Sequence, residues 1–168
     1  MAEEGHEVAV FHRGSARSPL PEGVARIIGD RCRLQDHASS LRALAPDVVL
    51  DMYALSESDA RAAISALTGV ASRLVVVSSQ DVYRAYGRLI GLEPGETEPV
   101  PIGEDAPLRK KLFPHRGQAP QLHDYEKILV ERVAMGAPGI AATVLRLPMV
   151  YGPGDRQHRF RPYLEQMR

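Results

Sequence analysis

Short runs of β-branched and aliphatic residues alternate with segments of helical pattern along most of this chain. The apolar runs cover residues 8–11, 25–28, 48–52, 74–77 and 143–147, and several are apolar at consecutive positions, as buried parallel strands are. Helical patterns cover 37–44, 56–67 and 125–135; the second begins with a capping box from Ser56 to Asp59 and is followed by Gly69. The alternation predicts an α/β fold with a parallel sheet flanked by helices.

Composition limits what this fold can do. The 168 residues suit a single domain, 1–168, and 21 basic against 21 acidic side chains provide no field for nucleic acid or an anionic membrane. Cys32 is the one cysteine, so no internal disulfide or cysteine cage can form, and the six histidines show no metal-binding spacing. No apolar run is long enough to span a bilayer. We expect a cytoplasmic protein without a metal and without nucleic-acid or membrane partners.

A proline-rich insertion at about 87–122 interrupts the alternation. It has six prolines, at positions 94, 99, 101, 107, 114 and 120, and a basic cluster from Arg109 to Lys111. A loop of this length in a compact domain usually covers or lines a site. A solvated surface insertion is the alternative, and the sequence leaves both interpretations open.

The two ends depart from a complete dinucleotide-binding fold. Only about six residues precede the first strand candidate, and no G-x-G-x-x-G pattern occurs. We therefore expect a Rossmann-like sheet that lacks its first βα unit, with residues 1–5 as the end of the helix that would follow it. Residues 160–168 begin an amphipathic helix, and no C-terminal substrate lobe follows.

Four segments stand in a specific order: GHEVAVFHRG at 5–14, VVVSSQDVY at 75–83, DYEKILVER at 124–132 and LRLPMVYGPGD at 145–155. Together they resemble the extended short-chain dehydrogenase/reductase family, also called the NAD-dependent epimerase/dehydratase family. The similarity extends from about residue 5 to the C-terminus.

The resemblance implies a Ser, Tyr and Lys catalytic set, in which Ser79 is the serine and Lys127 the lysine. In this family the tyrosine exchanges a proton with the substrate oxygen and stands four residues before the lysine, but here that position is His123. On a continuous helix Tyr125 lies about 200° around from Lys127 and is expected to face away. Either His123 replaces the tyrosine as acid/base, or the site is impaired.

The resemblance also assigns cofactor contacts. His12 and Arg13 follow the strand that meets the adenosine ribose, and a guanidinium there suits a 2′-phosphate, which favours NADP over NAD. Asp30 is either the acid that meets the adenine amino group or a simple turn residue.

The nicotinamide half of the cofactor is assigned to a second group of residues. Met52, Tyr53 and Ala54 resemble the segment beside the nicotinamide ribose, and Lys127 is expected to hold that ribose.

Substrate contacts are less regular. Met149 occupies the position where the family commonly has an asparagine, which removes a usual polar contact to sugar nucleotides. Arg156, His158, Arg159 and Arg161 follow. They are either a site for a phosphorylated substrate or a solvated helix face.

Two functions follow. The first is an NAD(P)-dependent epimerase, dehydratase or reductase acting on a nucleotide sugar or another hydroxyl or carbonyl compound. We expect this fragment to be inactive alone. For the full-length form, a homodimer is one of the oligomeric states that the sequence allows. The alternative is a non-catalytic Rossmann protein that senses a dinucleotide or binds a protein or RNA partner.

Overall fold

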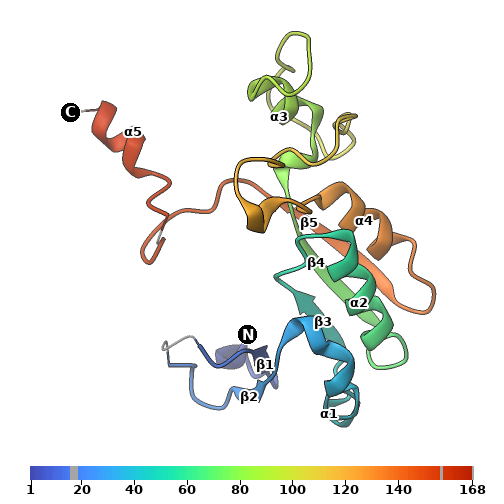
Figure 1. Ribbon diagram of the computed structural model, residues 1–168. Coiled ribbons are helices and arrows are strands. Elements are labelled where there is room, and N and C mark those ends of the chain that lie inside the picture. The colour runs from blue at the N-terminus through green and yellow to red at the C-terminus, as the bar shows by residue number, and fades with distance from the viewer. Residues whose placement is uncertain (16–18, 156, 168) are drawn as a thin grey trace.

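The computed structural model describes residues 1–15, 19–155 and 157–167 (Figure 1). It has five strands, all in parallel pairs: β1 (Ala9–His12), β2 (Ala25–Ile28), β3 (Val48–Asp51), β4 (Arg73–Ser79) and β5 (Ala141–Leu147). The helices are α1 (Ala38–Leu44), α2 (Glu57–Leu67), α3 (Arg84–Leu89), α4 (Lys127–Met135) and α5 (Arg161–Gln166). The predicted α/β class and the parallel strands are confirmed.

The strands form two sheets where the sequence predicts one. β1 pairs with β2, and β3, β4 and β5 pair in that order, while the described residues include no hydrogen bond between β1 and β3. The resulting order β2-β1, then β3-β4-β5, matches the 3-2-1-4-5-6 order of a doubly wound fold with the central strand left out. The division therefore lies where the sequence predicts the absence of the first βα unit.

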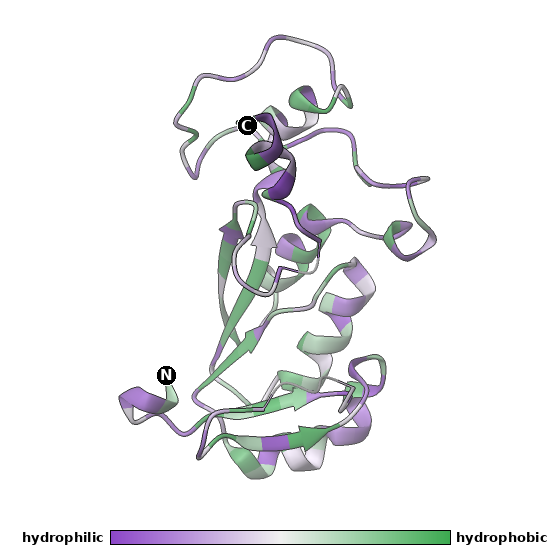
Figure 2. Cartoon of the chain, turned by 90° about the vertical axis from the view of Figure 1, so that its left-hand side faces the viewer, coloured by the Kyte–Doolittle hydropathy of each residue, from purple (hydrophilic) through white to green (hydrophobic). Residues whose placement is uncertain are grey.

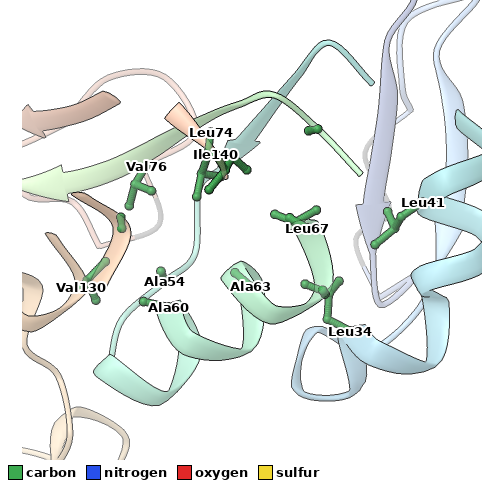
Figure 3. Close-up of a cluster of buried hydrophobic side chains, with 13 residues drawn as sticks. Leu34, Leu41, Ala54, Ala60, Ala63, Leu67, Leu74, Val76, Val130 and Ile140 are labelled. Carbon is green, nitrogen blue, oxygen red and sulfur yellow. The ribbon is translucent and has the colours of Figure 1, made fainter. Parts of the chain in front are cut away.

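The core lies between the three-stranded sheet and the helices α2 and α4. β4 alternates strictly, so that Leu74 and Val76 point to the helices, and Figure 2 shows β4 and β5 as largely hydrophobic. They meet Ala60, Ala63 and Val130 in the cluster of Figure 3. The small alanines of α2 allow this helix to approach the sheet closely, which fixes the ends of β3 and β4 relative to α4.

Specific hydrogen bonds account for where two helices begin. Ser56 and Asp59 form the predicted capping box of α2. α4 begins at Lys127, two residues later than predicted, because Glu126 has extended backbone and its carboxylate caps the Ile128 amide. The Glu126 amide donates instead to the Leu55 carbonyl, which excludes Tyr125 from the helix.

The insertion at 87–122 is attached to the domain rather than solvated throughout. A bridge joins Tyr83 to Leu108, and the Arg109 side chain is completely buried. Elsewhere the chain leaves the domain: the segment after β5 and helix α5 extends away from the sheets (Figure 1).

Candidate active site

The predicted site residues follow the carboxyl ends of parallel strands. His12 ends β1, Asp30 follows β2, the 52–54 segment follows β3, Ser79 ends β4 and Met149 follows β5. In open parallel sheets, ligands bind at this edge, next to the point where the strand order reverses. The fold therefore places the candidate residues at the edge where a ligand is expected.

Ser79 ends β4 and caps the 3₁₀ turn that follows it. Its Oγ accepts the amide hydrogen of Asp81 at 3.2 Å. Because a hydroxyl both donates and accepts, the Ser79 hydrogen remains available for a neighbouring oxygen. Ser79 is thus held in place by a backbone amide.

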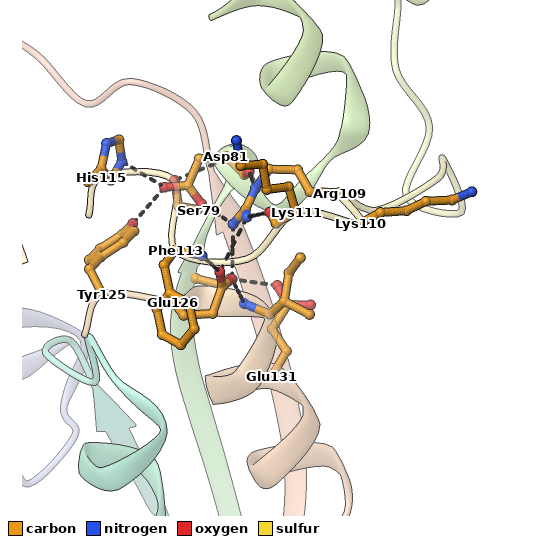
Figure 4. Close-up of polar contacts among 12 residues, drawn as sticks. Ser79, Asp81, Arg109, Lys110, Lys111, Phe113, His115, Tyr125, Glu126 and Glu131 are labelled. Carbon is orange, nitrogen blue, oxygen red and sulfur yellow. Dashed lines mark hydrogen bonds and ion pairs between the residues drawn. The ribbon is translucent and has the colours of Figure 1, made fainter. Parts of the chain in front are cut away.

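Tyr125 lies with Ser79 and Asp81, and the prediction that it faces away is wrong. Its hydroxyl donates to Asp81 Oδ2 at 2.7 Å (Figure 4). The predicted separation of about 200° between Tyr125 and Lys127 requires a helix that includes residue 125. In the structure α4 begins only at Lys127. Burial, followed by the Asp81 charge, holds the pKa of Tyr125 well above its usual value, and a hydrogen bond from Ser79 acts in the opposite direction.

Lys127 reaches back from the first turn of α4 to the ends of β3 and β4. Its Nζ donates to the Ala54 carbonyl at 2.5 Å and the Val77 carbonyl at 2.9 Å, and lies 6.0 Å from the centre of the Tyr125 ring. Burial lowers the pKa of this amine. An ammonium has three hydrogens, so one remains for another acceptor.

His123 is not brought to this group. Its side chain is 64% exposed and its Nε2 lies 4.0 Å from Asp124 Oδ1. It precedes α4 rather than sharing a face of that helix with Lys127. The shared face was the reason for its catalytic assignment, and the structure removes that reason.

Four further residues around Ser79 were not predicted as site residues, although Arg109 belongs to the basic cluster of the insertion. Asp81 accepts from Tyr125, and His115 Nε2 lies 3.7 Å from Asp81 Oδ2. Arg109 pairs with Glu126 at 2.9 Å, with neither side chain exposed to solvent. Asp81 lies in the S-S-x-x-V-Y segment, where its position after Ser79 was a usable signal. No local pattern marks His115, which lies in the insertion.

At the end of β1, His12 has an unsatisfied donor. Its Nδ1 accepts the Gly14 amide at 3.0 Å, so in the neutral ring the hydrogen lies on Nε2, which is buried and has no partner among the described residues. The neighbouring Arg13 is exposed. These two groups fit the polar ribose end of a dinucleotide. The Asp30 carboxylate accepts the Cys32 amide at 2.9 Å and caps the following turn. This contact agrees with the interpretation of Asp30 as a turn residue.

The segment after β3 is held by a carboxylate. Asp51 Oδ1 accepts the amides of Tyr53 at 3.0 Å and Ala54 at 3.2 Å, while Oδ2 pairs with Arg31. Met52 and Tyr53 are exposed, whereas Ala54 is buried. The segment therefore offers two exposed side chains on a fixed backbone at the edge where the nicotinamide half is predicted.

A cleft of about 1040 Å³ opens between the insertion, α3 and β5. Arg146 crosses it and donates to Glu131 at 2.8 Å and to the Tyr83 hydroxyl at 3.1 Å. Ser78 also donates to Glu131, at 2.6 Å. The cleft adjoins the β4 end that carries Ser79, and it combines apolar strand surface with a few fixed polar groups, as ligand sites do.

The predicted substrate contacts after β5 are weakly supported. Met149 is 39% exposed. Arg159 pairs with Asp155 at 3.1 Å and Arg161 with Glu165 at 2.6 Å, so both cations already have a carboxylate. Arg156 lies outside the described residues. This pairing favours the solvated-surface interpretation of the basic run.

No group of three or more His, Cys, Asp or Glu side chains in the described part of the chain is arranged to hold a metal ion. Among the same residues, no helix combines the length and apolar character needed to cross a membrane.

No family model matches the sequence, and no curated protein matches it. Several solved structures are similar to the chain. The Bordetella bronchiseptica enzyme WbmG in complex with NAD aligns over 99% of this chain and 53% of its own, with 17% identity and a TM-score of 0.66. The UDP-Glc/GlcNAc 4-epimerase from Campylobacter jejuni aligns over 84% of this chain and 45% of its own, with 15% identity and a TM-score of 0.58.

These likenesses establish the fold. The chain has the Rossmann-like fold of these enzymes, and it spans about half of their length. WbmG has also been solved with NAD and UDP together; that structure aligns over 90% of this chain and 48% of its own, with 18% identity and a TM-score of 0.60.

Proposed function

We propose that this chain is the dinucleotide-binding part of an oxidoreductase of the extended short-chain dehydrogenase/reductase family. It exchanges hydride between NAD(P) and a hydroxyl or carbonyl carbon, with a nucleotide sugar as the preferred substrate class. The observation that carries this proposal is the meeting of Ser79, Tyr125 and Lys127 at the carboxyl ends of β3 and β4. Hydroxyl, phenol and ammonium are the three groups that this chemistry requires.

Each group has a role that its contacts allow. Ser79 donates its hydroxyl hydrogen to the reacting oxygen of a bound substrate. Tyr125 exchanges a proton with the same oxygen, the role that the sequence analysis assigned to His123. Lys127 uses its third hydrogen for a ribose hydroxyl. NAD(P), when bound, supplies the hydride acceptor.

For the cofactor, the structure supports the assignment of its adenosine end to His12 and Arg13. The buried Nε2 of His12 lacks a partner, and the exposed Arg13 guanidinium suits a 2′-phosphate. This combination favours NADP, whereas WbmG was solved with NAD. Both dinucleotides therefore belong in the test.

Hydride transfer tests the proposal directly. NADH or NADPH absorbance is followed with UDP-linked hexoses, using this chain and any longer product of its gene. Ser79→Ala and Tyr125→Phe should each lower the rate about a hundredfold, the usual size of an acid/base contribution. His123→Ala should change it less than about threefold, since that side chain is exposed. If His123→Ala is the damaging change, the assignment of Tyr125 is wrong.

A non-catalytic dinucleotide-binding protein is the second candidate. Tyr125 donates to a carboxylate and Lys127 donates to two carbonyls, so the phenol has no adjacent lysine hydrogen bond to activate it. On this hypothesis NAD(P) binds with measurable affinity, while neither the chain nor the Tyr125→Phe variant transfers hydride. Calorimetry combined with the absorbance assay separates the two candidates.

A further inference from the structure

The insertion contributes a histidine to the group around Ser79. His115 and Tyr125 approach Asp81 from two sides, with their ring centres 5.1 Å apart (Figure 4). Tyr125 donates to Asp81 Oδ2 at 2.7 Å, and His115 Nε2 lies 3.7 Å from the same oxygen. One carboxylate oxygen therefore lies between a phenol and an imidazole.

Asp81 is a carboxylate with few partners for its burial. Its side chain is 6% exposed, and its Oδ1 has no hydrogen-bond partner among the described residues. The nearest cation is Arg109, whose NH2 is 4.0 Å from Oδ1. A buried carboxylate of this kind is stabilised by any donor or proton that reaches it. Asp81 is thus a strong acceptor next to Tyr125.

His115 is oriented by a second contact. Its Nδ1 lies 3.2 Å from Gln118 Oε1. With the amide oxygen as acceptor, the neutral ring has its hydrogen on Nδ1, so the lone pair of Nε2 faces Asp81. The side chain is 18% exposed, which gives the ring access to water.

We propose that Tyr125, Asp81 and His115 form a proton relay from the substrate oxygen to solvent. The relay rests on the function proposed above, in which the substrate alcohol gives its hydride to NAD(P)⁺. The alcohol proton passes to Tyr125 Oη, the original phenol proton passes to Asp81 Oδ2, and the proton then moves to Nε2 of neutral His115. Tyr125 and Asp81 regain their starting states, and His115 becomes an imidazolium. The imidazolium then releases a proton to water, to which its ring is 18% exposed.

The relay requires one movement. The 3.7 Å separation between His115 Nε2 and Asp81 Oδ2 must close by several tenths of an ångström, and catalytic hydrogen bonds are often longer before substrate binds. His115 lies on a loop, where such an adjustment is small.

Other charged or titratable groups surround the relay and must be considered in any pH dependence. Arg109 approaches Asp81 from the insertion and Lys127 approaches Tyr125 from α4. The Tyr86 ring of α3 lies 6.3 Å from His115. Of these neighbours, none is a type of side chain that ordinarily changes charge between pH 5 and 8, whereas imidazole does.

The coupling can be measured in the chain without cofactor or substrate. We suggest following the tyrosine Cζ signals of ¹³C-labelled protein from pH 5 to 9, with Tyr125 assigned through Tyr125→Phe. We expect the Tyr125 signal to move in one step within pH 5–8 while its phenol stays protonated. The step should disappear in His115→Gln and in Asp81→Asn and persist in His123→Gln, a matched change at an exposed histidine.

Two results would overturn the relay: a Tyr125 signal with no step in the wild type, or a step that survives intact in His115→Gln. Asp81 is buried, so Asp81→Asn can unfold the chain; His115 lies on a partly exposed loop, and His115→Gln keeps the test decisive. Because no hydride transfer is measured, a failed relay is distinguishable from a failed enzymatic function.

Discussion

Arg109 and Glu126 form a bidentate ion pair with both side chains excluded from solvent. NH2 donates to Oε1 at 2.9 Å and NH1 donates to Oε2 at 3.3 Å. Glu126 also caps α4, and its Oε2 accepts the Phe113 amide at 2.5 Å. The pair therefore joins the insertion to the start of the helix that carries Lys127.

Breaking this pair should destabilise the domain strongly. Arg109→Met leaves the Glu126 carboxylate buried without its cation, and we expect the free energy of unfolding to fall by about 3–5 kcal/mol in urea titrations. Arg116→Met is the control, because that guanidinium is exposed and lies over the Phe113 ring. A loss below about 1 kcal/mol in Arg109→Met would contradict the role of the pair.

Tyr125 should make the domain sensitive to alkali. Its pKa is raised in the folded chain, first by burial and then by Asp81, so unfolding above pH 10 releases a proton. Stability then decreases with rising pH, by about 1.4 kcal/mol per unit for this group. Urea titrations from pH 8 to 11.5 should show a flatter decline for Tyr125→Phe than for the wild type.

Two features of that experiment isolate Tyr125. The lowered pKa of Lys127 gives a slope of opposite sign, since the unfolded chain binds more protons, but it is common to both proteins. Tyr53→Phe alters an exposed tyrosine and should leave the decline unchanged. Parallel declines for wild type and Tyr125→Phe would show that this phenol ionises normally.

The capping box of α2 should contribute measurably to stability. Ser56 Oγ accepts the Asp59 amide and the Asp59 carboxylate accepts the Ser56 amide at 3.0 Å. Ser56→Ala should lower the free energy of unfolding by about 0.5–2 kcal/mol. Ser65→Ala, an exposed change within the same helix, should have no such effect, and equal losses in the two variants would argue against the cap.

Cofactor preference should depend on Arg13. In whichever form of the protein binds a dinucleotide, Arg13→Asp should lower the affinity for NADP relative to NAD by roughly ten- to a hundredfold, because a charge-assisted contact to a 2′-phosphate is lost. Calorimetry with both nucleotides measures the ratio. Arg33→Asp alters an exposed guanidinium that pairs with Asp36 and should leave the ratio unchanged. An unaltered ratio in Arg13→Asp would remove Arg13 from the site.

Much of the fold could be predicted from local sequence. Strands β1 to β5 lie within two residues of the predicted runs, because β-branched and aliphatic residues favour strands. Burial is less complete than predicted, since only β4 has buried residues. The start of α2 could be predicted from the capping box, because its hydrogen bonds join only Ser56 and Asp59, three residues apart. Among the described residues β1 and β3 belong to separate sheets, at the place where the sequence predicts that the first βα unit is lacking.

The position of Tyr125 could not be predicted in this way. Its placement depends on where α4 begins, and that start depends on Glu126, whose carboxylate binds Arg109, 17 residues earlier in the chain. His115 reaches Asp81 only because the insertion folds back, and no spacing rule encodes such a contact. When an ion pair between residues distant in the sequence determines where a helix begins, residue spacing alone does not predict which side of the helix a residue occupies.

The bridge between Tyr83 and Leu108 divides the insertion into two loops with different tolerance to change. Residues 109–125 carry Arg109 and His115, so their length and geometry are fixed by the site. In the outer loop Val100 and Ile102 are exposed. Loop-closure entropy varies slowly with length, by about 0.6 kcal/mol per doubling. We therefore expect engineered forms to tolerate a longer, shorter or cleaved chain at 99–103, whereas changes in the length of the inner loop should not be tolerated.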